Sequence, residues 1–297
     1  MPTAAQNHRV VHGWSVDVED WFHILEYAAA PDLAAWDKLP SHVVAGTEKM
    51  LDLLQKHRFS GTFFALGWIA ERFPELLAQI AERGHEIGSH GHLHQLVPQL
   101  GRDGFARDLD LSLAAISRAI GKDVKAFRAP GFSIGDADTW AFGVLASRGI
   151  ALDASLFLAN RAHGGLLLQR NRPFDLILPN GQTIVEVPTV PRNFAGQQLV
   201  FQGGGYLRLL PSWFIEQSFA AAENAQQPVI AYIHPRELVA DQPRMDLPFK
   251  RRFKYYVGLA GVEQKIERLF SRFAFGTLSD VAANTPRDRP VHVGVTE

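Results

Sequence analysis

Short apolar runs alternate with stretches in which apolar residues recur every three or four positions along most of the chain. The brief runs predict buried strands, and the periodic stretches predict amphipathic helices. Glycine closes several of the periodic stretches, as expected at helix ends. The predicted strands are 10–18, 61–67, 85–89, 125–129, 150–153, 183–187 and 228–234, and the predicted helices are 40–57, 71–83, 103–120, 136–148, 211–224 and 261–270.

Strands that alternate with helices at this interval predict βα units and a mostly parallel sheet. Residues 160–210 depart from this pattern, because the turn signals HGG, PNG and QGGG separate short β-like runs. We therefore predict an α/β protein with a loop-rich β insertion in its C-terminal half. One domain is predicted over residues 1–283, followed by a polar tail over 284–297.

Composition narrows the functional classes. The 30 Lys and Arg residues against 31 Asp and Glu give a net charge of −1, which argues against chain-wide nucleic-acid binding. The chain has no cysteine, so any metal must be held by His, Asp or Glu. No apolar run approaches the roughly 18 residues of a membrane helix, and the polar N-terminus resembles no signal peptide. The location expected from these features is cytoplasmic.

Two clusters of candidate ligands follow predicted strands. Asp17, Glu19 and Asp20 fall within four residues at the end of the first strand, either as a solvated acidic loop or as metal ligand and general base. Four of the twelve histidines lie between residues 85 and 94, and His90 and His94 have the i,i+4 spacing that faces one ion. A solvated loop is the alternative, but a cluster directly after a buried strand favours a metal site.

Two further strands end in residues that suit catalysis. Arg128 precedes a Pro-Gly turn at the end of one strand, where a guanidinium can fix a carboxylate. His234 ends the last buried strand, either as a satisfied core residue or as a general acid. Because the carboxyl ends of parallel strands share one edge, we expect these side chains and the two clusters to converge.

Other polar and aromatic groups carry weaker signals. A run of basic residues, Arg251, Arg252 and Lys254, is interpreted as a solvated face. A set of aromatic residues could form a floor for stacking sugars, although aromatic side chains more often belong to the core. These aromatic residues are Trp21, Phe22, Phe132, Tyr206 and Trp213.

The order of these motifs resembles the polysaccharide deacetylases with a NodB-type domain, carbohydrate esterase family 4. The resemblance covers residues 14–236 and leaves 237–283 as a C-terminal extension of the catalytic domain. The stretches DVEDWFH, HEIGSHGHLH and YIHPRELVADQPR look most similar to the exosortase-associated exopolysaccharide deacetylase branch, which is similar to the peptidoglycan deacetylase and allantoinase group. The resemblance implies a deformed (β/α)7 barrel, a divalent metal, usually Zn²⁺, and removal of N-acetyl groups from amino sugars.

The resemblance also implies the metal ligands. His90 and His94 match the histidine motif, with Gly91 where the family has Ser or Thr. The family's adjacent acidic pair is replaced here by Asp-Val-Glu-Asp. The third ligand is therefore either Glu19 or Asp20, with only one of the two expected.

The remaining roles follow from the same resemblance. Asp17 is expected to be the general base, Arg128 to hold Asp17 in place, and His234 to protonate the leaving amine. The acidic residue that tunes the general acid has no clear match, and Asp153 and Glu186 are its candidates.

We thus predict a hydrolase of carbon–nitrogen amide bonds that deacetylates N-acetylhexosamine in an exopolysaccharide or related glycan. The expected partner is this glycan, with no nucleic acid. The alternatives are an allantoinase-like hydrolase of a small amide on the same fold, and a sugar-binding homologue without turnover. A glycosyltransferase with an acidic metal site would leave His90 and His94 without a role.

Overall fold

A computed structural model describes residues 10–25, 30–159, 164–165, 168–194 and 197–294. Its main feature is one ten-stranded sheet with the order β10-β1-β2-β3-β4-β5-β7-β6-β12, in which β11 also pairs with β1. The strands are β1 Val11–Val18, β2 Thr62–Ala65, β3 Glu86–Ser89, β4 Ala126–Phe127, β5 Leu152–Asp153, β6 Phe174–Ile177, β7 Thr183–Glu186, β10 Ile230–Ile233, β11 Ala274–Gly276 and β12 Val291–His292.

From β10 to β7 every neighbouring pair in this sheet is parallel. Only the β6–β7 pair is antiparallel within the sheet, and a separate antiparallel ribbon joins β8 Arg192–Phe194 to β9 Gln197–Leu199. The seven consecutive parallel strands confirm the predicted α/β class with a mostly parallel sheet. The β8–β9 ribbon lies in the segment predicted as a loop-rich insertion.

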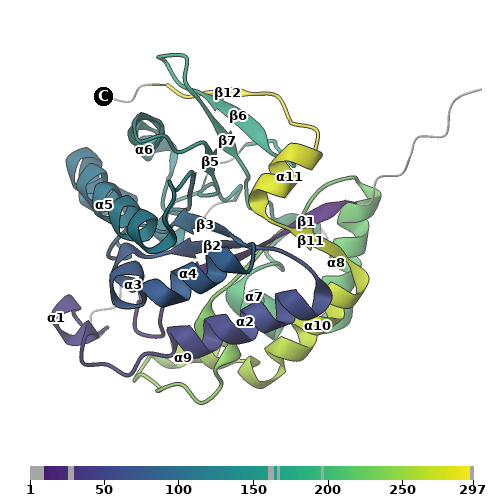
Figure 1. The fold of residues 1–297 in the computed structure, drawn as a ribbon. Helices are drawn as coiled ribbons and strands as arrows, with labels where there is room; N and C mark the ends of the chain where they lie inside the picture. The colour runs from purple at the N-terminus through teal and green to yellow at the C-terminus, as the bar shows by residue number, and fades with distance from the viewer. Residues whose placement is uncertain (1–9, 26–29, 160–163, 166–167, 195–196, 295–297) are drawn as a thin grey trace, which may run out of the picture.

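Helices connect β1 to β2, β2 to β3, β3 to β4 and β4 to β5, and helices surround the sheet (Figure 1). Leu51 and Leu54 of the helix after β1 pack into one buried core with Val16 and Val18 of β1. The α-helices are α1 Leu33–Trp36, α2 Val43–His57, α3 Gly67–Arg72, α4 Pro74–Glu82, α5 Val97–Ile120, α6 Trp140–Ser147, α7 Gly204–Leu209, α8 Ser212–Asn224, α9 Phe249–Tyr256, α10 Val262–Arg272 and α11 Leu278–Asn284.

Several boundaries differ from the predicted ones. The helix predicted over 71–83 is two helices, because Pro74 begins α4 and the chain bends at Phe73 between them. Residues 291–292, within the predicted polar tail, form β12 and extend the sheet beside β6. None of the helices among the described residues is long and apolar enough to cross a membrane.

Candidate active site

Four strand ends bring polar side chains to one rim of the sheet. Asp17 is the second-last residue of β1 and pairs in register with Phe64 of β2. Glu19 is the first residue after β1. His90, Arg128 and His234 are the first residues after β3, β4 and β10. Because these strands are parallel, their carboxyl ends lie on the same side of the sheet.

A cavity of about 430 Å³ opens at this rim. Five of the side chains singled out in the sequence line it, namely Asp17, Glu19, His90, His94 and His234. All five side chains are largely buried in the protein; the most exposed, His234, has 16% of its side-chain surface accessible. These five predicted groups therefore meet in one cavity of a size suited to a ligand.

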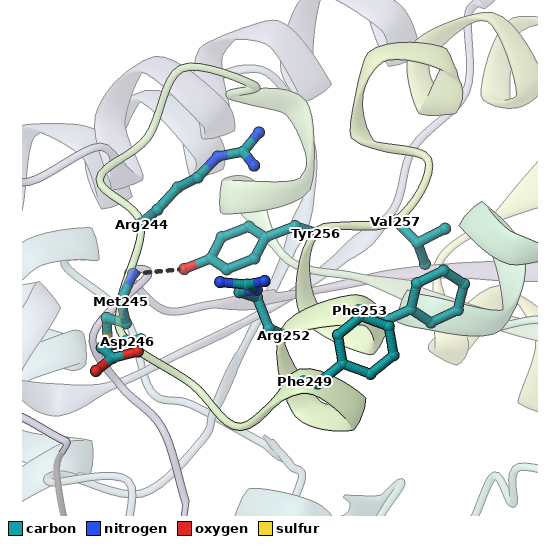
Figure 2. A pocket seen from close by; sticks show the side chains of 8 residues that line it. All are labelled: Arg244, Met245, Asp246, Phe249, Arg252, Phe253, Tyr256 and Val257. Carbon is teal, nitrogen blue, oxygen red and sulfur yellow. Dashed lines mark hydrogen bonds between the residues drawn. The ribbon is translucent and has the colours of Figure 1, made fainter.

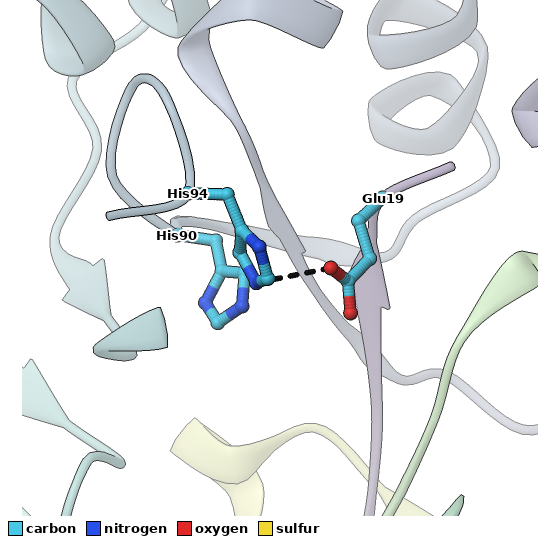
Figure 3. A group of neighbouring side chains, drawn as sticks. All are labelled: Glu19, His90 and His94. Carbon is cyan, nitrogen blue, oxygen red and sulfur yellow. Dashed lines mark ion pairs between the residues drawn. The ribbon is translucent and has the colours of Figure 1, made fainter. Parts of the chain in front are cut away.

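Glu19, His90 and His94 form a compact group whose potential ligand atoms all lie within 4.8 Å of one another (Figure 3). His90 Nδ1 lies 2.8 Å from the carbonyl oxygen of Arg128, so this nitrogen donates to the backbone and Nε2 keeps a free lone pair. Burial lowers the pKa of His90 to about 4, which keeps the imidazole neutral. A neutral imidazole oriented by a backbone carbonyl is the usual form of a metal-binding histidine.

The carboxylate of Glu19 fits the same interpretation. Its Oε2 atom is buried, accepts no hydrogen bond from the described residues, and lies 3.0 Å from His94 Nε2. A carboxylate oxygen and an imidazole nitrogen at this separation need a proton or a cation between them. Two histidines with one carboxylate are a ligand set found at catalytic zinc sites.

Asp20, the alternative third ligand, has a different role in the structure. Its carboxylate accepts hydrogen bonds from the backbone N–H groups of His42 and Val43 and from the Ser41 hydroxyl. These groups precede or begin α2, so Asp20 satisfies the free N–H groups of that helix. The structure brings Glu19, and not Asp20, to the two histidines.

Asp20→Ala should therefore reduce stability and leave metal content unchanged. The backbone N–H groups of half-buried His42 and buried Val43 would lose their acceptor, which costs about 1–3 kcal/mol. Denaturant unfolding of the metal-free protein measures this loss. A variant with wild-type stability and no bound metal would reverse the assignment of Glu19 and Asp20.

Arg128 lies beneath the cavity, fully buried. Its Nη1 atom donates to Asp17 Oδ1 and to the Ser15 hydroxyl, both at 2.8 Å, and its guanidinium carbon lies 4.4 Å from the centre of the Phe64 ring. The contact to Asp17 uses one nitrogen rather than two. The buried guanidinium nevertheless fixes one oxygen of Asp17.

The loop that carries the histidines is held by a helix. Asp108 of α5 accepts hydrogen bonds from the backbone N–H groups of His92 and Leu93 at 2.8 and 3.2 Å. Gly91 has φ +77°, and a Cβ atom there would come within 2.9 Å of Asp108 Oδ2. Glycine at this position allows the carboxylate to approach the backbone, so Asp108 stabilises the loop between the two ligands.

His234 contacts two carboxylates. Its Nε2 atom lies 2.9 Å from Glu19 Oε1, and its Nδ1 atom lies 3.4 Å from Glu237 Oε1. Burial would lower the pKa of His234, but these carboxylates outweigh it and raise the pKa to about 9. For Glu237, burial is outweighed mainly by Arg208, His234 and Arg236, and the pKa falls to about 2. Glu237 is therefore ionised, and its carboxylate faces Nδ1 of His234, the ring nitrogen away from Glu19.

Asp153 and Glu186, the two candidates for this tuning role, have other partners. Both are fully buried at the adjoining ends of β5 and β7, where Asp153 accepts hydrogen bonds from Ser155 and Glu186 accepts one from the Leu156 backbone N–H. Burial raises the pKa of Asp153, and burial together with the Asp153 charge raises that of Glu186. The carboxylate that contacts His234 Nδ1 is that of Glu237.

Sequence reasoning missed Glu237 and His23. Glu237 follows His234 by three residues, and the short 3₁₀ turn Pro235–Leu238 returns its side chain to the histidine. His23 lines the cavity, and its Nδ1 atom accepts a hydrogen bond from the Asp20 backbone N–H. Burial, with smaller contributions from neighbouring charges, lowers the pKa of His23 to about 3, so it is neutral.

The aromatic residues proposed as a stacking floor divide into three groups. Phe132 and Tyr206 line the cavity. Trp21 and Phe22 are buried in a separate aromatic cluster, so for them the core interpretation holds. Trp213 is 59% exposed on α8 and does not line this cavity.

Two family models match this chain. Residues 33–142 match the model described as polysaccharide deacetylase, and residues 154–283 match a domain of unknown function. The first match contains His90, His94 and Arg128, whereas His234 and Glu237 lie in the second. Asp17 and Glu19 precede both matches, so the cavity combines residues from inside and outside the deacetylase model.

Curated relatives match shorter parts of the chain. A peptidoglycan-N-acetylglucosamine deacetylase of Bacillus cereus is 28% identical over 141 residues, which are 43% of this chain and 51% of the relative. A chitooligosaccharide deacetylase of Sinorhizobium fredii is 34% identical over 74 residues, 25% of this chain and 33% of the relative. The chain thus aligns with about half or less of the length of these relatives.

Solved structures match nearly the whole chain. A candidate polysaccharide deacetylase from Mycobacterium smegmatis has a TM-score of 0.64 and 20% identity, covering 97% of this chain and 96% of that one. A mutant of a CE4 family pseudoenzyme with restored enzymatic activity has a TM-score of 0.51 and 12% identity, covering 96% and 70%. These likenesses show the fold, which is the predicted deformed (β/α)7 barrel.

Proposed function

We propose that this protein hydrolyses the N-acetyl groups of amino sugars in a glycan, and the match of residues 33–142 to the polysaccharide deacetylase model supports this proposal. One observation carries the proposal. A candidate metal group, a carboxylate held by a buried arginine, and a histidine held by a second carboxylate all face one cavity. Amide hydrolysis needs a Lewis acid to polarise the carbonyl, a base to activate water and an acid to protonate the leaving nitrogen.

We propose that Glu19, His90 and His94 hold one divalent ion, and that the ion is Zn²⁺. When bound, such an ion would supply Lewis-acid polarisation of the acetyl carbonyl. The donor set supports zinc, because two imidazole nitrogens and one carboxylate oxygen leave further coordination positions open.

We propose that two protein side chains carry out the two proton transfers of the reaction. Asp17 accepts a proton from the water whose oxygen attacks the acetyl carbon, and Arg128 holds the carboxylate in place. As the carbon–nitrogen bond breaks, His234 donates a proton to the nitrogen. The products are acetate and the free amino sugar, so one water molecule accounts for all atoms.

The proposed substrate is a polymer, most specifically an exopolysaccharide, as the sequence resemblance implies. Aromatic rings of Phe132, Tyr206 and Tyr232 line the cavity and provide apolar faces against which sugar rings pack. An acetylated chain end or internal sugar could lie on these faces with its acetyl group toward Asp17.

Metal content and acetate release test this function together. The purified protein should bind close to one divalent ion and release acetate from N-acetylglucosamine oligomers, and chelation should remove both properties. Longer oligomers should be better substrates than free N-acetylglucosamine. Turnover of allantoin without acetate release would favour the small-amide hydrolase, and sugar binding without any turnover would favour the inactive homologue.

His234→Ala should lower kcat by about 10²–10⁴-fold while the metal stays bound, because the leaving nitrogen loses its proton donor. Glu237→Gln should lower kcat by about 10–100-fold, since it removes the charge that orients His234. The variants are compared by single-turnover acetate release. If Glu237→Gln has the wild-type rate, the contact to His234 at 3.4 Å has no part in catalysis.

A further inference from the structure

A second hollow lies beside the candidate active site. It has a volume of about 650 Å³ and is formed by one side of α9 and by the preceding loop at 244–246 (Figure 2). The deacetylase family model ends at residue 142, and the model that covers α9 describes a domain of unknown function. The comparisons therefore give this groove no role.

Helix α9 separates the groove from the catalytic cavity and contributes side chains to both. Arg251, Lys254 and Tyr255 line the catalytic cavity, whereas Phe249 and Phe253 line the groove. Val257, directly after the helix, lines both hollows. Arg208 fixes this arrangement from α7 by donating to the backbone carbonyls of residues 254, 255 and 257.

The groove exposes aromatic rings that the core does not use. Phe249 is 75% exposed and Phe253 is 49% exposed, one helical turn apart, and Figure 2 shows both rings projecting from the same side of α9. The Tyr256 ring completes the surface, with the Arg244 guanidinium 5.3 Å from the centre of the ring. The hydroxyl oxygen of Tyr256 accepts a hydrogen bond from the Met245 backbone N–H at 2.9 Å. Adjacent exposed rings offer flat apolar faces for stacking.

The charge of α9 selects among possible ligands. Its sequence, FKRRFKYY, has four basic residues and no acidic one, within a chain whose net charge is −1. Arg252 and Lys254 are exposed, in agreement with the predicted solvated face. Arg252 also lines the groove, and Arg251 and Lys254 line the catalytic cavity. A ligand that crosses α9 would therefore meet cations on both sides.

We propose that the groove formed by α9 and residues 244–246 is a binding subsite for the continuing chain of an acidic polysaccharide. Sugar rings would stack on Phe249 and Phe253, and carboxylates of the glycan would pair with Arg252. This inference rests on the proposed deacetylase function, which it deepens by assigning an anionic glycan as the substrate class. The groove adjoins the catalytic cavity across α9, and Val257 lines both hollows, so a chain that enters the active site could extend into the groove. This adjacency favours a glycan over a lipid surface.

Binding measured without turnover tests the subsite. The probes are a hyaluronan decasaccharide, which carries both carboxylates and N-acetylhexosamine, and a neutral chitohexaose. The wild-type protein should bind the decasaccharide more tightly at low salt than at high salt, since cations contact its carboxylates. The double variant Phe249→Ser/Phe253→Ser should bind it about tenfold more weakly, because both stacking faces are lost.

Trp213→Ser is the matched control, since it removes an equally exposed aromatic ring away from both hollows and should keep wild-type affinity. Equal affinity of the double variant and the wild type would overturn the subsite. Binding through α9 to phosphatidylglycerol vesicles, without glycan binding, would overturn it in favour of a membrane contact. Decasaccharide binding through α9 without acetate release from any oligomer would leave the subsite standing and refute the deacetylase function.

Discussion

Glu19→Gln should abolish binding of the divalent ion and lower kcat by at least about 10²-fold. The carboxylate supplies the only negative charge among the three proposed ligands, and its Oε2 atom already faces His94 Nε2 at 3.0 Å. A neutral amide would remove that charge and leave two neutral imidazoles to hold a dication. Loss of a Lewis acid that contributes several kcal/mol corresponds to a rate loss of this size.

The matched control is Asp20→Asn, one residue away. Its amide oxygen can still accept from the start of α2, so it should keep both the ion and the rate within about threefold. Metal content by elemental analysis and acetate release are measured on both variants. Stoichiometric metal in Glu19→Gln would show that the ligand set is wrong.

The fold was predictable because its signals are local. The first and last strands of the catalytic rim, 10–18 and 228–234, are rich in apolar residues. The strands between them are bounded by helices whose apolar spacing or terminating glycine is visible in the sequence. Parallel strands then place residues 17, 90, 128 and 234 on one edge, whatever the details of the loops. The convergence of these residues therefore followed from topology, before any side-chain position was known.

The choice between Glu19 and Asp20 was not predictable, since it depends on a distant contact. The carboxylate of Asp20 accepts hydrogen bonds from N–H groups at the start of α2, which begins 23 residues later. Glu237 was missed for a related reason. Its relation to His234 depends on a 3₁₀ turn and on Arg208 of α7, neither of which leaves a periodic pattern in the sequence.

Helix α9 illustrates a different limit. Its basic residues give the same sequence pattern whether they face bulk solvent or the wall of a cavity. Only the packing of α9 against α7, fixed by the backbone contacts of Arg208, shows that Arg251 and Lys254 lie at the catalytic cavity. A charge pattern thus identifies a surface, and tertiary structure decides what that surface adjoins.

Asp17→Asn should lower kcat by about 10²–10⁴-fold with the divalent ion still bound. The amide keeps the shape of the side chain and can still accept from Arg128 Nη1, but it cannot take a proton from water. The change also leaves the buried guanidinium without its counterion, so some loss of stability is expected. Rates must therefore be compared on folded protein, checked by unfolding and by metal content.

Ser15→Ala separates the proposed role of Asp17 as a base from its role as the counterion of Arg128. It removes the other hydrogen bond to Arg128 Nη1 and keeps the carboxylate of Asp17, so its effect on kcat should be much smaller than that of Asp17→Asn. A near-normal kcat in Asp17→Asn would exclude Asp17 as the base. A loss of metal in the same variant would instead make Asp17 a ligand, and the base would then have to be sought among the other groups that line the cavity.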